Sequence, residues 1–332
     1  MTGFYLTDPM EETPGGLSRA RESLSTVLQQ GNPNDPQTIQ VIVGWHTRLE
    51  RTFLTLAPGT RLLLWSHGVG ATAFYSSRPF QSLLRWLVRI PDILNLFRTL
   101  SRTSYLVTAY PRQSIFDTRS FDEAIARWMR VPVCSIGNPI DTNFWTPILG
   151  SPIIVPNVLS IGRLEWQKGH EKALGIVLAT PTNITFTVLA PYAEPTYIGK
   201  LRQRAVGRGC PQRMQILIGL SPTQRREHLR ESLCTLCWSE TEYQSLAILE
   251  SLACGCPVIA RSRGWLRNRL VPGILVARNQ THASRLITEL YDNPLWRHEL
   301  SMAGRDYVAT HHSLASVASH WHALGSRIGV DG

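Results

Sequence analysis

Short apolar runs alternate with segments of helical periodicity along nearly the whole chain, and this alternation constrains the fold more than any other feature. The runs that we expect to form strands are residues 4–7, 39–43, 62–65, 105–108, 158–161, 184–189, 214–218, 234–238 and 257–260, and residues 131–136 are a further short apolar run. The expected helices include residues 17–28, 80–100, 170–178, 193–206, 221–232 and 246–253, and the chain beyond residue 260 is expected to be largely helical. A helix between two strands returns the chain to the same end of the sheet, so the strands pair in parallel. The sequence therefore predicts an α/β protein.

The length of 332 residues suits two domains of about 150 residues each. Residues 141–155 have the composition of a linker, because they are rich in Asn, Pro, Gly and Ser. We expect two Rossmann-like, parallel-sheet domains facing a cleft, residues 1–150 and residues 151–332. We leave open that the last helix crosses back to the first domain.

Positive charge is in excess, with a formal net charge of +10 and a pI near 9.7. Such a balance favours anionic partners, which include nucleoside diphosphates, nucleic acids and acidic lipid headgroups. Residues 1–16 lack the basic start and apolar core of a signal peptide, and no apolar stretch reaches the ~18 residues of a membrane span. We therefore expect a cytoplasmic protein.

Six cysteines raise the question of a metal site. Cys234 and Cys237 have a zinc-like spacing, and Cys254 and Cys256 follow closely. A strand over residues 233–238 would turn the thiols of Cys234 and Cys237 to opposite faces, because side chains alternate along a strand. We expect reduced structural thiols and no metal or other cofactor.

The strongest local pattern lies in residues 239–260. Ser245 can cap a helix of about eight residues, Gly255 can end it in a left-handed conformation, and Pro257 precedes a buried strand. This pattern places a helix N-terminus at the carboxyl edge of a parallel sheet, where open α/β folds bind their ligands. Free amide groups and the helix dipole at that point suit a phosphate.

Two acids belong to this pattern, Glu242 in the loop before the helix and Glu250 within the helix. Eight residues apart, they do not share one helix face, so they could bind different parts of an extended ligand. The alternative from spacing alone is a solvated loop charge and a solvated helix acid.

The same block resembles the E-x7-E element of the family-four glycosyltransferases, which have the GT-B fold. The positions that agree are Glu242, Leu246, Glu250, Ala253, Gly255, Pro257 and Val258. Residues 243–245 depart from the family, which has Gly-Phe-Gly where this chain has Tyr-Gln-Ser. Upstream, Gly162-Arg163-Leu164 followed by Lys168-Gly169 is similar to the family motif G-R-L-x-x-x-K-G.

Less specific likenesses lie in the first half of the chain. Gly15-Gly16 resembles the family's N-terminal glycine loop, and His67 resembles the histidine that lies near the transferred sugar. A lone glycine pair is otherwise a turn, and a single histidine at a strand end otherwise has a structural role. The resemblance spans nearly the whole chain but is specific only in residues 158–260.

The resemblance implies the retaining, metal-independent transfer of a hexose from a nucleoside-diphosphate sugar. The residues that would bind the donor are Gly15, Gly16, Arg163, Lys168, Ser245, Leu246 and Glu250, and the catalytic set would be Glu242, His67, Arg163 and Lys168. Cations around the diphosphate would stabilise the charge that grows on the leaving group. Glu242 would face the sugar hydroxyls and Glu250 the ribose.

Residues 83–102 hold four arginines and one acid among leucines and aromatic residues. Arg85 and Arg89 are one helical turn apart, as are Arg98 and Arg102. This composition suits a basic amphipathic helix on an anionic membrane, with a glycan or lipid-linked acceptor and a peripheral location on the inner face of the membrane. The alternative is a domain helix with buried leucines and exposed arginines.

Two other functions stay open at this point. A glucosyltransferase acting on nucleic acid would account for the positive charge, although the leucine-rich segment 83–102 favours it less. The loss of Gly-Phe-Gly leaves open a catalytically weak protein that binds nucleotide sugars.

Overall fold

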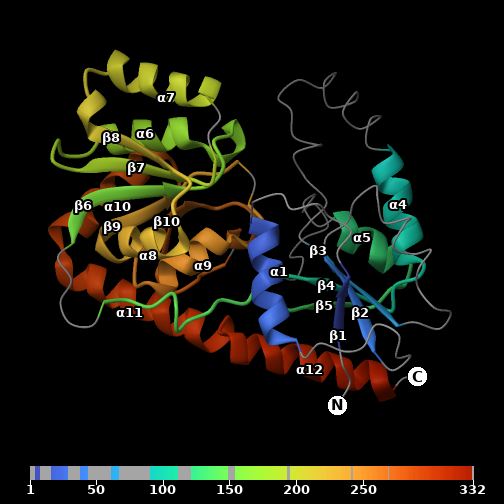
Figure 1. The fold of residues 1–332 in the computed structure, drawn as a ribbon. Helices are drawn as coiled ribbons and strands as arrows, with labels where there is room; N and C mark the ends of the chain where they lie inside the picture. The colour runs from blue at the N-terminus through green and yellow to red at the C-terminus, as the bar shows by residue number, and fades with distance from the viewer. Residues whose placement is uncertain are drawn as a thin grey trace. The chain divides into compact units, whose positions relative to one another are not determined.

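Both halves of the chain fold around a parallel β-sheet, as Figure 1 shows. The computed structural model describes residues 4–7, 16–28, 38–43, 61–66, 90–110, 121–148, 154–192, 195–240, 242–267 and 269–330. The chain divides into two compact units, of which Met1–Pro139 with Leu314–Gly332 form the first and Ile140–Ser313 the second. The division thus falls at Pro139 instead of residue 150, and the last helix belongs to the first unit.

The sheet of the first unit has five parallel strands in the spatial order β1-β2-β3-β4-β5. They are β1 (Phe4–Thr7), β2 (Ile39–Val43), β3 (Leu62–Ser66), β4 (Tyr105–Thr108) and β5 (Val133–Ser135). The helices described in this unit are α1 (Gly16–Val27), α4 (Ile90–Leu100), α5 (Phe121–Trp128) and α12 (Leu314–Val330). The four predicted strands are present, and the short apolar run at residues 131–136 contains β5; each carries the apolar residues that a buried parallel sheet requires.

Aromatic side chains hold α12 on the first unit. Trp321 of α12 packs edge-on against Phe4 and Trp65, with both ring centroids at 6.0 Å. All three side chains are almost completely buried, and Gly325, one turn along α12, packs against the Phe4 ring. Such large buried rings contribute strongly to a core, which explains why the end of the chain returns to this unit.

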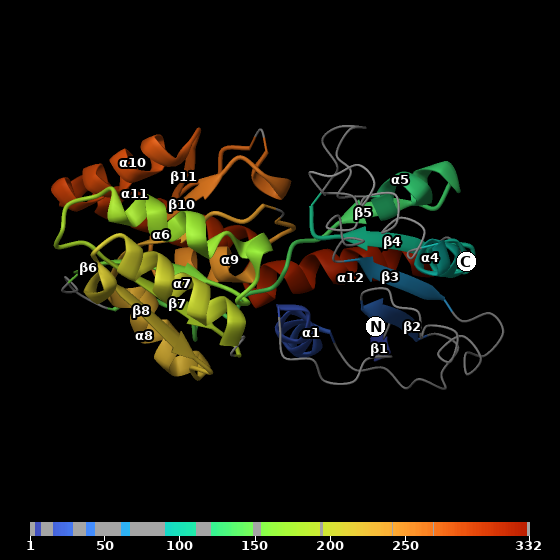
Figure 2. The same ribbon diagram turned by 90° about the horizontal axis from the view of Figure 1, so that it is seen from above.

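The sheet of the second unit has six parallel strands in the order β11-β10-β9-β6-β7-β8. They are β6 (Val155–Ile161), β7 (Thr185–Ala190), β8 (Met214–Ile218), β9 (Ser232–Cys237), β10 (Val258–Arg261) and β11 (Ile274–Ala277). The helices are α6 (His170–Leu178), α7 (Pro195–Gly207), α8 (Pro222–Glu231), α9 (Leu246–Ala253), α10 (Gln280–Asp292) and α11 (Pro294–His311), and Figure 2 shows helices on both sides of the sheet. If β6 is taken as the first strand, the strands follow the spatial order of a Rossmann fold. The direction in which successive strands are added to the sheet reverses between β6 and β9.

One strand corrects the sequence analysis, which treats the chain beyond residue 260 as helical. Ile274–Ala277 forms β11, which pairs in parallel with β10 at the edge of the sheet. Its apolar run has only four residues, so its pattern could not be told from that of a short helical segment. Pro272-Gly273, just before this run, is a turn-forming pair and indicates that a new element begins after it.

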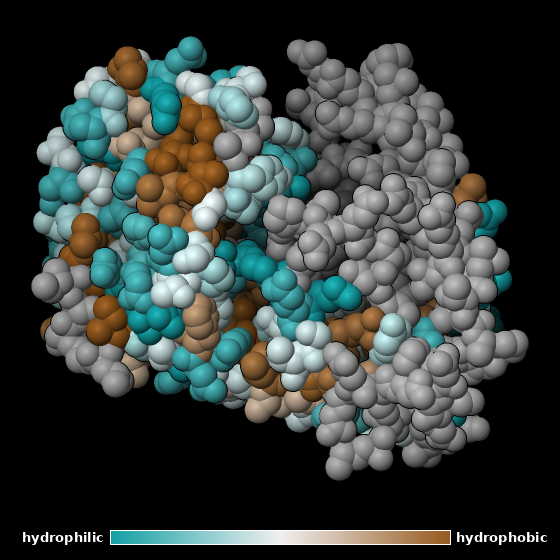
Figure 3. Space-filling model, viewed as in Figure 1, coloured by the Kyte–Doolittle hydropathy of each residue, from teal (hydrophilic) through white to brown (hydrophobic). Residues whose placement is uncertain are grey.

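The helix expected over residues 80–100 is described from Ile90 onward, as α4. Pro91 lies in its first turn, where the missing N–H has no intrahelical partner to lose. Arg85 and Arg89 lie outside the described residues. No helix in the described ranges is both long enough and apolar enough to cross a membrane. On the face drawn in Figure 3, hydrophilic residues cover much of the second unit, with hydrophobic groups between them.

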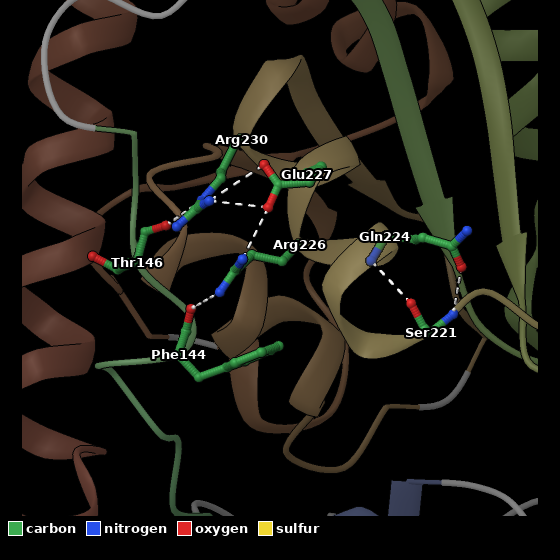
Figure 4. Close-up of polar contacts among 7 residues, drawn as sticks. All are labelled: Phe144, Thr146, Ser221, Gln224, Arg226, Glu227 and Arg230. Carbon is green, nitrogen blue, oxygen red and sulfur yellow. Dashed lines mark hydrogen bonds and ion pairs between the residues drawn. The ribbon is translucent and has the colours of Figure 1, made fainter.

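Residues 141–148, part of the expected linker, are fixed to the second unit by arginine side chains. Arg226 donates to the Phe144 carbonyl at 3.3 Å and Arg230 to the Thr146 carbonyl at 2.6 Å (Figure 4). Arg305 of α11 donates to the Thr142 carbonyl at 2.9 Å. These bonds to charged donors explain why the division falls before this segment.

Candidate functional site

The carboxyl edge of the second sheet brings two loops together where the strand order reverses. One loop follows β6 and contains residues 162–169, and the other follows β9 and contains residues 238–245. The backbone N–H of Glu240 donates to the Gln167 carbonyl at 2.8 Å. The two segments that carry the predicted motifs are therefore joined directly.

Two glycines allow neighbouring segments to approach the loop after β9 closely. A Cβ on Gly169, with φ 68°, would lie 2.2 Å from the Trp238 carbonyl oxygen. A Cβ on Gly264, with φ 58°, would lie 1.5 Å from the carbonyl oxygen of Glu242. Both the backbone conformations and the short distances therefore require glycine. Gly169 belongs to a predicted motif, whereas the sequence analysis misses Gly264, because nothing local shows what lies opposite it.

Lys168 and Glu242, predicted for different parts of a ligand, form an ion pair in the structure. Lys168 Nζ lies 3.2 Å from Glu242 Oε2, and the two side chains are 24% and 10% exposed. The nearby carboxylate raises the pKa of Lys168 above its usual value, although burial acts in the opposite direction. The ammonium group is thus held in its charged form, with Glu242 as its counter-charge.

Arg163 follows β6, and its half-exposed side chain lies 3.0 Å from Glu165. Its backbone is fixed by His170, whose Nε2 donates to the Arg163 carbonyl at 3.0 Å. His170 Nδ1 accepts a hydrogen bond of 2.8 Å from the Ser160 hydroxyl. Burial lowers the pKa of His170 to about 4, so the ring is neutral at pH 7. His170 is a support of this loop that the sequence analysis misses.

Helix α9 begins and ends where the sequence predicts. Ser245 is the N-cap, but its side chain makes no capping hydrogen bond within the described part of the chain, and Leu246 behind it is buried. The first amides of a helix have no intrahelical acceptors, so this end offers donors to an anion. Glu250 is buried within the helix, 3.4 Å from Arg225 of α8, and Gly255, with φ 76°, ends the helix.

A second charged group braces the same edge of the sheet. Glu240 pairs with Lys172 of α6 at 2.5 Å and with Arg261 of β10 at 2.9 Å. Burial alone would raise the pKa of Glu240, but the hydrogen bonds from both cations outweigh it, and the pKa lies below its usual value. Arg261 also stacks on Trp238, with 5.5 Å between the guanidinium carbon and the ring centroid. The sequence analysis misses this brace, since its members lie on three separate elements.

The residues predicted in the first half of the chain are only partly described. Gly15 and His67 lie outside the described residues, and Gly16 is the first residue of α1. Ser66, just before His67, donates its hydroxyl to the carboxylate of Asp122. Asp122 is fully buried, and this burial raises its pKa to about 6. Of the predicted site residues that the structure describes, those that it brings together belong to the second unit.

The cysteines form no disulfide in the described part of the chain. Burial raises the pKa of both Cys237 and Cys256 to about 12, so these thiols remain protonated at neutral pH. Among the described side chains, no group of three or more His, Cys, Asp or Glu residues is arranged to hold a metal ion.

Solved structures share this architecture over nearly the whole chain. Sucrose-phosphate synthase from Thermosynechococcus elongatus superposes with a TM-score of 0.71 and 14% identity, over 99% of this chain and 89% of that one. HepE from Anabaena, in complex with UDP, superposes with a TM-score of 0.69 and 13% identity, over 98% of this chain and 100% of that one. The chain has the fold of the GT-B glycosyltransferases, with two parallel sheets flanked by helices.

The family comparison concerns the second unit. Residues 149–307 match the family described as glycosyl transferases group 1, and this range contains every site residue that the structure brings together. The D-inositol 3-phosphate glycosyltransferase of Nocardiopsis dassonvillei is 32% identical over 102 residues, which are 28% of this chain and 24% of that protein. The chain thus spans about a quarter of the length of this curated relative. The chain therefore has the GT-B fold, and the match to the group 1 glycosyl transferases lies within its second unit.

Proposed function

We propose that the protein transfers a hexose from a nucleoside-diphosphate sugar to an acceptor, with retention of configuration and without a metal ion. One observation carries the proposal: Arg163, the Lys168–Glu242 pair and the start of α9 all belong to the carboxyl edge where the strand order reverses. The group 1 match over these residues supports it, and so does the UDP complex of a protein with the same fold.

Each site residue has a proposed role. Arg163, Lys168 and the first amides of α9, from Ser245 and Leu246 onward, bind the diphosphate, because a dianion attracts these groups more strongly than one carboxylate does. The diphosphate then replaces Glu242 as the partner of Lys168. Glu242 turns to the sugar hydroxyls, and Glu250 accepts hydrogen bonds from the ribose.

The transfer breaks the bond between the anomeric carbon and the phosphate oxygen, and the acceptor oxygen bonds to the same face of the sugar. Positive charge grows on the sugar ring and negative charge on the diphosphate, which takes up the acceptor's proton as it leaves. Arg163 and Lys168 lower the barrier because they interact more strongly with that growing charge than with the bound substrate. His67 and the Gly15-Gly16 loop are proposed, on the family resemblance, to contact the donor.

A thermal-shift panel of UDP-, GDP- and ADP-sugars tests this function, because a ligand that binds the native state raises the melting temperature. We expect one nucleotide class to raise it in the parent and to raise it much less in Lys168→Ala. No shift across the panel would contradict the proposal. Tight binding without donor hydrolysis or transfer would instead support the nucleotide-sugar-binding protein.

For the acceptor, we propose a lipid-linked molecule reached at an anionic membrane surface through α4 and α5. Leu94 and Trp128 are 53% and 78% exposed, and Trp128 packs edge-on against Phe97 at 6.0 Å. Arg98, in the last turn of α4, and Arg102, two residues beyond the end of the helix, are exposed. Exposed aromatic and aliphatic groups beside arginines suit a membrane interface with acidic lipids.

Flotation with phosphatidylglycerol vesicles tests this surface. We expect the parent to float, and the variant combining Trp128→Ala, Arg98→Ala and Arg102→Ala to stay at the bottom of the gradient. Trp166→Ala is the matched control, since Trp166 is also 53% exposed but belongs to the second unit. Equal flotation of the triple variant and the parent would end the membrane proposal.

A further inference from the structure

One ion pair between α8 and α9 has no part in the roles given above. Nη2 of Arg225, on α8, lies 3.4 Å from Oε1 of Glu250, which lies within α9. The two side chains are only 14% and 4% exposed. Because little water screens them, their charges are coupled more strongly than those of a surface pair.

A tryptophan restrains the same guanidinium group. The guanidinium carbon of Arg225 lies 4.8 Å from the ring centroid of Trp145, a side chain that is itself buried. The Trp145 carbonyl accepts a 2.9 Å hydrogen bond from Arg305, and its ring packs edge-on against Phe144 at 4.9 Å. Arg225 is thus held by a fixed ring as well as by Glu250, which leaves it few alternative rotamers.

The neighbouring arginines of α8 have different partners. Arg226 stacks on Phe144 at 4.7 Å and pairs with Glu227, and Arg230 pairs with the same acid (Figure 4). Both donate to backbone carbonyls of the segment that contains Phe144 and Thr146. Arg226 therefore matches Arg225 in charge, helix and aromatic stacking, but its carboxylate partner is a surface residue.

We infer that Arg225 is a positioning residue for Glu250. Arg225 sets the direction of the Glu250 carboxylate and balances its charge, so that the carboxylate recognises the ribose of the donor. The inference rests on the proposed function, in which Glu250 faces that ribose. A carboxylate discriminates between a ribose and a deoxygenated sugar only if its oxygens point at the hydroxyls, since the gain comes from directed hydrogen bonds. A planar guanidinium held on a fixed ring supplies such a direction.

Steady-state kinetics with the donor identified by the thermal-shift panel test this role. We expect Arg225→Gln to raise the donor KM about ten-fold and to change kcat by less than about three-fold, because it weakens a charged hydrogen bond to the nucleotide end. The preference for the natural donor over one lacking the ribose 2′- and 3′-hydroxyls should shrink in the same variant. Arg226→Gln should keep the parent's KM and the parent's preference.

A double-mutant cycle separates positioning from general damage. In a Glu250→Gln background, Arg225→Gln should raise KM by less than about two-fold, because the group through which it acts is already changed. Arg225→Lys keeps the charge but loses the planar stack on Trp145, so its donor KM should lie between those of the parent and Arg225→Gln. If Arg225→Gln does not fold, Arg225→Lys replaces it in the double-mutant cycle.

Two results would count against the inference in different ways. If Arg225→Gln and Arg225→Lys keep the parent's KM and hydroxyl preference while Glu250→Gln loses both, Arg225 does not position Glu250, and the proposed function stands. If the parent neither binds nor uses any nucleoside-diphosphate sugar, the proposed function fails, and the inference fails with it.

Discussion

Lys168 Nζ lies 3.2 Å from Glu242 Oε2, so an ion pair lies at the place proposed for the diphosphate. The pair joins the loop after β6 to the loop after β9. Because both side chains are mostly buried, removing one partner leaves the other charge poorly compensated. On the proposed account, Glu242 holds the place of the diphosphate until the donor arrives.

Lys168→Ala should lower kcat by ~10- to 150-fold, which corresponds to a charged hydrogen bond of ~1.5–3 kcal/mol lost from the transition state. It should also lower the melting temperature, since Glu242 loses its counter-charge. The double variant Lys168→Ala/Glu242→Gln should recover the melting temperature without recovering turnover. Kinetics and thermal unfolding measure the two effects, and unchanged turnover in folded Lys168→Ala would remove Lys168 from the site.

Gly264→Ala should be more damaging than Gly209→Ala, although φ is positive at both glycines. A Cβ at position 264 would collide with the Glu242 carbonyl oxygen, whereas at position 209 it would meet nothing within 4 Å. Gly209→Ala should therefore cost only the ~1–2 kcal/mol of a left-handed alanine. Gly264→Ala should cost more and also weaken donor binding, because the Glu242 loop must move. Denaturant unfolding and donor titration measure both changes, and equal effects of the two variants would contradict this packing.

Arg213→Met should destabilise the second unit strongly. The buried Arg213 guanidinium donates to the carbonyls of Val177 and Ile184 at 2.8 Å each and to that of Pro181 at 3.0 Å, which closes the end of α6. Arg213→Met removes several charged hydrogen bonds to buried carbonyls at once, and we expect a loss of about 3 kcal/mol or more in the free energy of unfolding. Exposed Arg208→Met should change it by less than about 0.5 kcal/mol. Similar losses in the two variants would rule out this capping role.

The pH dependence of stability should carry the signature of His170. Its folded pKa of about 4 lies below its usual 6.5, so between these values the unfolded chain binds the proton more readily. The stabilisation is complete above pH 6.5 and is lost as the pH falls toward 4, which amounts to roughly 2 kcal/mol between about pH 7.5 and about pH 5.

His170→Asn removes the titrating ring and should lack this part of the pH dependence. Asp122, whose pKa is raised to about 6, shifts stability in the opposite direction, but it is present in both proteins and cancels in their difference. Urea unfolding of parent and variant at both pH values measures that difference. The same pH dependence in the two proteins would mean that His170 is not buried in its neutral form.

The sequence predicts the α/β class, every described strand except β5 and β11, and the bounds of α9, because these depend on local periodicity and capping residues. It does not predict which side chains meet. Lys168 and Glu242 are 74 residues apart, and Arg225 and Glu250 are 25 apart. Pairing across such distances depends on strand order and helix packing, which no local pattern encodes.

The end of the chain shows the same limit. The periodicity predicts a helical C-terminus, but not that α12 would pack on the first sheet through Trp321, Phe4 and Trp65. The residues missed at the site, His170 and Gly264, act on backbone carbonyls of Arg163 and Glu242. The need for a histidine at position 170 and for a glycine at position 264 is explained only by these carbonyl groups.

A crystal structure of the protein with the nucleoside diphosphate selected by the thermal-shift panel tests the central claim most directly. The account predicts phosphate oxygens about 3 Å from Lys168 Nζ and the Arg163 guanidinium, at hydrogen-bonding distance, with the ribose at Glu250. It also predicts that Glu242 has moved away from Lys168. A nucleotide bound elsewhere, with the Lys168–Glu242 pair intact, would contradict it.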